Sequence, residues 1–113
     1  MVIIHTLTMT AKEQPVIERA LVIHILGVIS ALEHRSITIE EAETLWFCRE
    51  VTTLLQRKAI QSEIVHILQL GRELRQIEKL IPHAVPKSLH DMRTLATNWL
   101  ISNDTKIAAT IWK

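Results

Sequence analysis

The feature that most constrains the fold is an apolar run of thirteen residues, Ala20 to Leu32, which is interrupted by the polar His24. As a helix this run would be about 20 Å long, which is short of the roughly 30 Å needed to cross a bilayer. A helix that is apolar on almost all sides is normally buried. Gly27 lacks a side chain and would let another helix cross closely. We therefore expect a buried core helix that begins near residues 12–15 and ends at about His34.

The rest of the chain carries further helical signals. Thr38 followed by Glu41 has the spacing of a capping box, which predicts a helix start near Ile39. Apolar residues then recur at helical spacing, and two prolines bracket a rigid connection before the last helix. Further helices are expected at about 49–58, from about Ala59 or Gln61 to Ile81, and from Ser88 or Asp91 through Trp99 to an end at residues 103–104, with Pro82 and Pro86 at the connection.

The two ends of the chain have a different pattern. Val2–Met9 is rich in Val, Ile and Thr, which suit a pleated strand. A strand needs a partner for its backbone, so we expect it to pair either with the tail around 106–112 or with a second copy in a dimer. Short connections favour antiparallel helix packing. The fold class expected is mainly α: one domain over residues 1–113, a four- to five-helix bundle with a short N-terminal β-strand.

Net charge and cysteine content indicate the cellular compartment in which the protein is expected and the class of partner that it is expected to bind. Thirteen basic and twelve acidic residues give a formal charge of +1, so no broad field steers the chain onto nucleic acid or an anionic membrane. Cys48 is the single cysteine, which excludes an intrachain disulfide and fits a reducing compartment. The N-terminus lacks the features of a signal peptide. We expect a cytoplasmic protein that does not insert into membranes.

Histidines and other polar clusters give no recognisable catalytic or metal motif. No two of the six histidines have the four-residue spacing of a helical metal site, and a lone cysteine excludes a Cys-rich zinc site. His24 is interpreted as a neutral core histidine. Ser62, Glu63 and His66 lie within one helical turn, but no turn that could form an oxyanion hole accompanies them. We therefore expect an exposed polar face there, and no enzyme activity, metal or cofactor. The acidic residues after Thr38 are explained by helix capping and the helix dipole.

A small basic strip on the third long helix is the candidate contact surface. Its cations are interrupted by Glu73 and Glu78, and an Arg75–Glu78 pair along the helix is expected. A terminal tryptophan is hard to bury in a small domain and often marks a contact site. The residues predicted to bind a partner are Arg72, Arg75, Gln76, Lys79 and Trp112.

Two stretches together resemble a known family. Ile29–His34 leads into Ile37–Glu43, and Leu70–Leu74 is followed by Ile77–Pro82. Over about two-thirds of the chain this resembles a family of small bacterial proteins of unknown function. The resemblance implies no catalytic residue, and it offers no counterpart for the tail Thr105–Lys113. At the level of the fold, the chain is also similar to the helical immunity proteins that neutralise bacterial toxins.

Three functional hypotheses remain. The first is a non-enzymatic protein-binding module, in one form an immunity-type inhibitor of a bacterial toxin. The second is a small nucleic-acid-binding transcriptional regulator that uses the helix at 61–81, which predicts a contiguous basic face. The third is a site assembled from distant histidines and carboxylates, which predicts a pocket where they converge. We expect the first.

Overall fold

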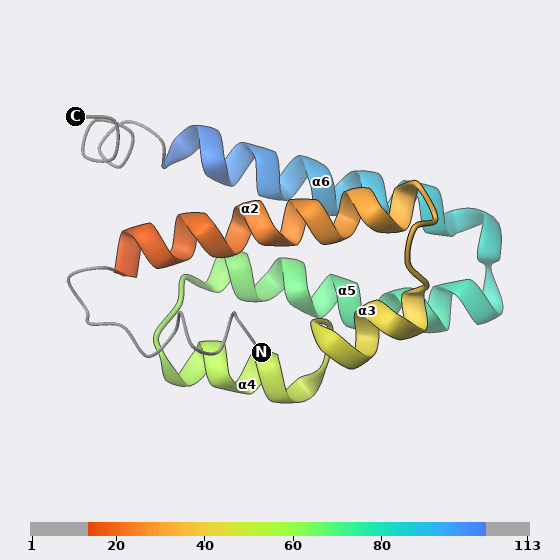
Figure 1. Ribbon diagram of the computed structural model, residues 1–113, viewed down its shortest axis with the longest axis horizontal. Helices are drawn as coiled ribbons and strands as arrows, with labels where there is room; N and C mark the ends of the chain where they lie inside the picture. The colour runs from red at the N-terminus through yellow and green to blue at the C-terminus, as the bar shows by residue number, and fades with distance from the viewer. Residues whose placement is uncertain (1–13, 104–113) are drawn as a thin grey trace.

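The structure, a computed structural model, describes residues 14–103. This part of the chain is a compact set of helices without a strand, which confirms the expected mainly α bundle (Figure 1). The expected N-terminal strand and its pairing with the tail lie outside the described residues. The elements are α2 (Gln14–Glu33), α3 (Ile39–Leu45), α4 (Arg49–Arg57), α5 (Ser62–Leu80), the 3-10 turn η2 (Pro82–Ala84) and α6 (Val85–Ser102).

The long helices α2, α5 and α6 run along the longest dimension of the molecule, which measures 45 Å. Helix α6 packs against both α2 and α5, while α3 and α4 pack against α5 (Figure 1). The core between them is mostly aliphatic, with Phe47 and Trp99 as its buried aromatic side chains. Burial of these apolar side chains at helical spacing is what holds the helices together.

Helix α2 is not buried on all sides, contrary to the sequence-based expectation. Its inward side chains are covered, but Val16 and Ile23 remain 41% and 53% exposed. With 20 residues, α2 is long and apolar enough to cross a membrane by length and composition alone, a test that core helices of soluble proteins also pass. The contacts of α2 with α6 and α3 bury one side of the helix, as is usual for a core helix of a soluble protein.

The close approach of another element that the sequence predicted at Gly27 occurs instead at Gly71. A Cβ added at Gly27 would meet nothing within 4 Å, so no described helix crosses α2 there. A Cβ added at Gly71 would lie 2.5 Å from Cγ of Phe47. Phe47 lies in the connection between α3 and α4 and is 1% exposed. The close approach in this fold therefore occurs at Gly71, where a buried aromatic ring lies against the backbone of α5.

The starts of α3 and α6 can be explained by nearby residues, and the start of α6 differs from the predicted position. Thr38 caps α3 as expected, because its Oγ1 accepts a hydrogen bond of 3.0 Å from the Glu41 amide. Helix α6 starts at Val85, earlier than Ser88 or Asp91, because a proline in the first turn needs no amide hydrogen bond and has a helical φ.

Helix α2 ends without a glycine. Arg35 adopts a φ of 57° in the left-handed region. The amide of Ser36 then donates to the Ala31 carbonyl, and that of Arg35 to the Leu32 carbonyl. This is the pair of hydrogen bonds of a Schellman motif, in a backbone conformation that glycine adopts more readily than arginine.

Candidate binding surfaces

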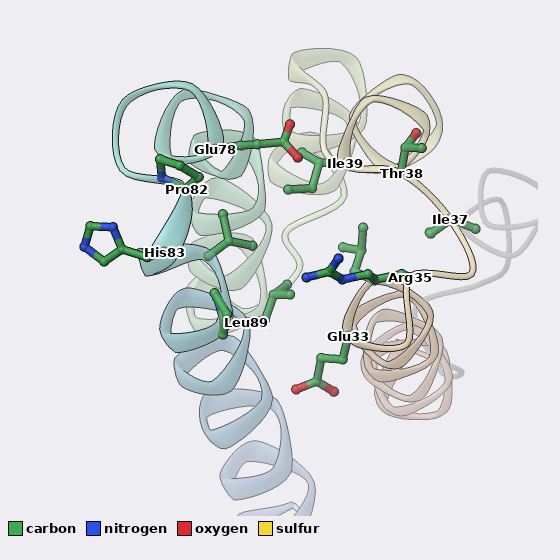
Figure 2. Close-up of a pocket in the computed structure, with 12 residues that line it drawn as sticks. Glu33, Arg35, Ile37, Thr38, Ile39, Glu78, Pro82, His83 and Leu89 are labelled. Carbon is green, nitrogen blue, oxygen red and sulfur yellow. The ribbon is translucent and has the colours of Figure 1, made fainter.

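A pocket of about 730 Å³ lies at one end of the bundle, and we call it the helix-end pocket. It forms where the end of α2, the start of α3, the end of α5 with η2, and the start of α6 meet (Figure 2). Its volume falls within the range of sites that bind ligands or side chains. Its apolar lining consists of Leu32, Ile37, Ile39, Pro82, Val85, Pro86 and Leu89.

Charged side chains surround this apolar lining. Glu33 forms an ion pair with Arg93 of α6, whose Nε donates to Oε1 at 3.1 Å. The hydrogen bond from Arg93 lowers the pKa of Glu33 from its ordinary value, and the same bond raises the pKa of Arg93. Arg35 and Glu78 also extend toward the opening (Figure 2), and within residues 14–103 neither has an ion pair. The pocket thus has an apolar interior and a mixed-charge rim.

Two large aliphatic side chains next to this pocket are exposed. Leu80 is 71% exposed and Ile81 is 48% exposed. They directly precede Pro82, which lines the pocket. Adjacent exposed aliphatic side chains beside an apolar hollow are a feature of surfaces that contact other molecules.

A second, smaller depression of about 410 Å³ lies between α5 and α6, and we call it the α5–α6 groove. Ser62, Glu63 and His66 line it together with Leu95 and Trp99. All three polar residues are exposed, as expected. The structure gives no hydrogen bond between Ser62 and His66 among the described residues, so the arrangement that a catalytic nucleophile and its base require is not assembled there.

A polar network around a buried carboxylate connects α2 and α6 through Gln61, the residue before α5, and the sequence did not predict it. Glu18 of α2 is 3% exposed. Its carboxylate accepts hydrogen bonds from the Gln61 backbone amide at 2.9 Å and from the Gln61 side-chain amide at 3.3 Å. The indole of Trp99 donates to the Gln61 Oε1 at 3.1 Å. The available signal was a lone carboxylate on the apolar face of α2, directly after the buried Ile17.

His24 is not a core histidine, contrary to expectation. It lies on an exposed position of α2 with its ring edge against Trp46, at a centroid distance of 4.2 Å. Partial burial lowers the pKa of His24 from its ordinary value of 6.5, because desolvation disfavours the charged imidazolium. Within residues 14–103, no three His, Cys, Asp or Glu side chains group so that they could hold a metal ion.

The predicted partner-binding strip lies on α5, and one of its members has another role. Arg72, Gln76 and Lys79 are exposed. Arg75 forms its ion pair with Glu43 of α3 at 3.2 Å, rather than with Glu78 as expected. This ion pair links α5 to α3. The fifth predicted residue, Trp112, lies outside the described residues.

Comparison with known proteins identifies one family. The family model described as "Protein of unknown function (DUF3969)" matches residues 12–112. The match includes most of the tail Thr105–Lys113, for which the resemblance had offered no counterpart. No curated protein and no solved structure matches the chain, so the comparisons do not support the likeness to toxin immunity proteins.

Proposed function

We propose that this chain, which belongs to the DUF3969 family of proteins of unknown function, is a non-enzymatic protein-binding module whose partner docks at the helix-end pocket. The observation that supports the proposal is the apolar hollow of about 730 Å³ with two exposed aliphatic side chains, Leu80 and Ile81, directly beside it. An apolar centre within a polar rim is the usual anatomy of a protein interface.

The chemistry of this end of the bundle favours a protein over a small molecule. A stable protein interface covers about 800 Å² on each partner, which is more than a pocket alone offers. Leu80 and Ile81, which directly precede the lining residue Pro82, add exposed aliphatic side chains at the same end of the bundle. The charged rim, with Arg35 and Glu78, would then fix the orientation of the partner by charge complementarity.

The narrower form of this proposal is a cytoplasmic inhibitor that binds a bacterial toxin. A second copy of the chain is another candidate partner. The alternative of a nucleic-acid-binding regulator has no specific observation in its favour, because Arg75 is engaged with Glu43 and acidic residues alternate with the other cations of α5.

The test compares two exposed aliphatic positions at different places on the bundle. Leu80 is 71% exposed near the helix-end pocket, and Ile101 is 69% exposed near the end of α6. Leu80→Asp and Ile101→Asp add the same charge to similarly exposed sites, so neither should disturb the core. The wild-type protein and both variants would be used to capture partners from the native cell, and each captured partner would then be titrated with the purified proteins by calorimetry.

We expect Leu80→Asp to weaken binding of the partner at least about tenfold, because it places a charge on the apolar contact surface. Ile101→Asp should stay within about twofold of the wild-type affinity, close to measurement error. A partner that binds all three proteins equally well would contradict docking at this pocket. Recovery of nucleic acid alone would contradict the protein-binding function itself.

A further inference from the structure

The end of α2 places an arginine in a backbone conformation that suits glycine. Arg35 has a φ of 57°, which lies in the left-handed region where a Cβ crowds the following carbonyl oxygen. The Schellman hydrogen bonds at this turn join only backbone atoms, so the arginine side chain contributes nothing to them. Strained residues of this kind cluster at sites where the side chain has a function. The end of the helix therefore does not account for an arginine at position 35.

The side chain of Arg35 extends into the helix-end pocket. In Figure 2 its guanidinium points from the end of α2 into the space between Ile39 and Leu89. A guanidinium is permanently charged and carries five N–H donors. Among residues 14–103, the Arg35 side chain has neither an ion pair nor a hydrogen bond. The pocket thus holds a cation whose donors are available to a bound group.

The acidic residues around the pocket do not neutralise this cation. Glu33 is engaged by Arg93 of α6. Glu78 reaches the opening from α5 and forms no ion pair with Arg35 within the described part of the chain. An incoming anion therefore meets one free guanidinium and one carboxylate across the opening. This arrangement favours an anion with a single charge over a phosphate group, whose charge of nearly two Glu78 would repel more strongly.

We propose that the helix-end pocket selects a peptide segment of the partner in which an Asp or Glu residue stands between aliphatic residues, and that Arg35 binds its carboxylate. This inference rests on the proposed function and specifies which group of the partner protein enters the pocket. A guanidinium holds a carboxylate through two parallel N–H···O hydrogen bonds, which are stronger than hydrogen bonds between neutral groups. The planar fork of donors makes arginine better suited than lysine to this contact.

The surroundings of Arg35 explain why the carboxylate should have aliphatic neighbours. The lining beside the guanidinium is apolar and includes Leu32, Ile39 and Leu89. Aliphatic side chains on both sides of the carboxylate would cover this lining and remove apolar surface from water. They would also exclude water from the ion pair, which strengthens the attraction between the charges. An anion without such neighbours would pair with Arg35 in water, where an ion pair contributes little.

The test titrates two end-blocked peptides, Ser-Leu-Glu-Leu-Ser and Ser-Leu-Gln-Leu-Ser, into the full-length protein and measures each Kd by two-dimensional NMR. The peptides differ only in the charge of the central side chain. Arg35→Gln removes the guanidinium from the pocket. Arg72→Gln is the matched control, because Arg72 is an exposed arginine of α5 that does not line the pocket. Octanoate serves as a third probe, since it joins a carboxylate to an aliphatic chain without a peptide backbone.

The wild-type protein and Arg72→Gln should bind the Glu peptide at least about fivefold more tightly than the Gln peptide, because a hydrogen bond to a charged group contributes more than one to a neutral group. Arg35→Gln should bind both peptides within about twofold of each other. Equal binding of the two peptides by the wild-type protein, or no binding of either, would overturn the proposal. A preference that survives in Arg35→Gln would overturn the role of Arg35. Octanoate that binds more tightly than the Glu peptide would overturn it in favour of a small aliphatic acid.

Arg35→Gly separates binding from folding. It removes the guanidinium and relieves the left-handed backbone, so it should abolish the preference for the Glu peptide while raising Tm by about 4 °C. A fall in Tm would overturn the proposal, because the side chain would then be needed for the fold. A captured partner that is weakened by Leu80→Asp but binds Arg35→Gln as tightly as the wild-type protein would overturn this inference and leave the proposed function intact. Failure to capture any protein would contradict the proposed function without altering the peptide measurements.

Discussion

The same substitution, glycine to alanine, should have opposite effects at the two helical glycines. At Gly71 the new Cβ would lie 2.5, 2.6 and 2.8 Å from three ring carbons of Phe47. Carbon atoms in contact normally lie about 3.5–4.0 Å apart. The ring would therefore have to move by about 1 Å, yet Phe47 is 1% exposed and packed in the core. At Gly27 the new methyl group would enter open space.

The expected magnitudes follow from these distances. Alanine in a helix is favoured over glycine by about 1 kcal/mol, so Gly27→Ala should raise the free energy of unfolding by about that amount. Gly71→Ala has the same gain, but overpacking of a filled core costs about 3 kcal/mol at the upper end of its usual range. The net loss at Gly71 is then about 2 kcal/mol. The two variants should differ by about 3 kcal/mol, or about 12 °C in Tm for a chain of this length.

Urea unfolding followed by far-UV circular dichroism would measure both free energies, with an unchanged m-value as the check on two-state behaviour. Adding Phe47→Leu tests the cause, because the penalty of Gly71→Ala should shrink when the ring is absent. The reasoning would be refuted if Gly71→Ala were as stable as the wild-type protein. A loss of stability in Gly27→Ala would show that another group packs closely on that glycine.

Three further predictions concern individual side chains. Thr38→Ala should lower the free energy of unfolding by about 1 kcal/mol in urea titrations, because the Glu41 amide loses its acceptor; an unchanged value would contradict the cap. Glu18→Ala should cost about 2 kcal/mol, because it removes a buried, charged acceptor that takes two hydrogen bonds from Gln61, and Glu18→Gln should cost less because its amide oxygen can still accept one bond; equal losses would argue against the hydrogen bonds. The pKa of His24 in the folded protein lies below the unfolded value of 6.5, so between these two pKa values the folded state binds fewer protons than the unfolded state. The free energy of unfolding should therefore fall as the pH drops from above 6.5 through the folded pKa. His24→Leu should remove this part of the pH dependence, and an NMR titration that placed the His24 pKa above 6.5 would contradict it.

Much of the local structure could be predicted from the sequence. Helical spacing of apolar residues predicted the long helices, since that pattern depends only on which residues share a helix face. Thr38 predicted the start of α3 because a cap involves residues within one turn. The start of α6 was placed too late, because Ser88 suggested a cap although the chain was already helical from Val85.

The helix-end pocket and the α5–α6 groove could not be predicted from the sequence. The helix-end pocket combines residues 32–39 with residues 78–89, and nothing in either stretch indicates that the other lies opposite. The predicted strip on α5 contributes none of its residues to the pocket lining. The α5–α6 groove brings the Ser62 cluster beside Trp99, more than thirty positions away in the chain.

The sequence by itself determined that this chain forms amphipathic and apolar helices, where several of them begin, and that it lacks the spacing of common catalytic and metal motifs. Those properties depend on neighbours within a few residues. Only the tertiary structure decided that Gly71 rather than Gly27 meets another element, that His24 lies at the surface, and that Glu18 is buried on Gln61. The reason is that each depends on which helix packs against which face, and the energy that selects this arrangement is summed over the whole core.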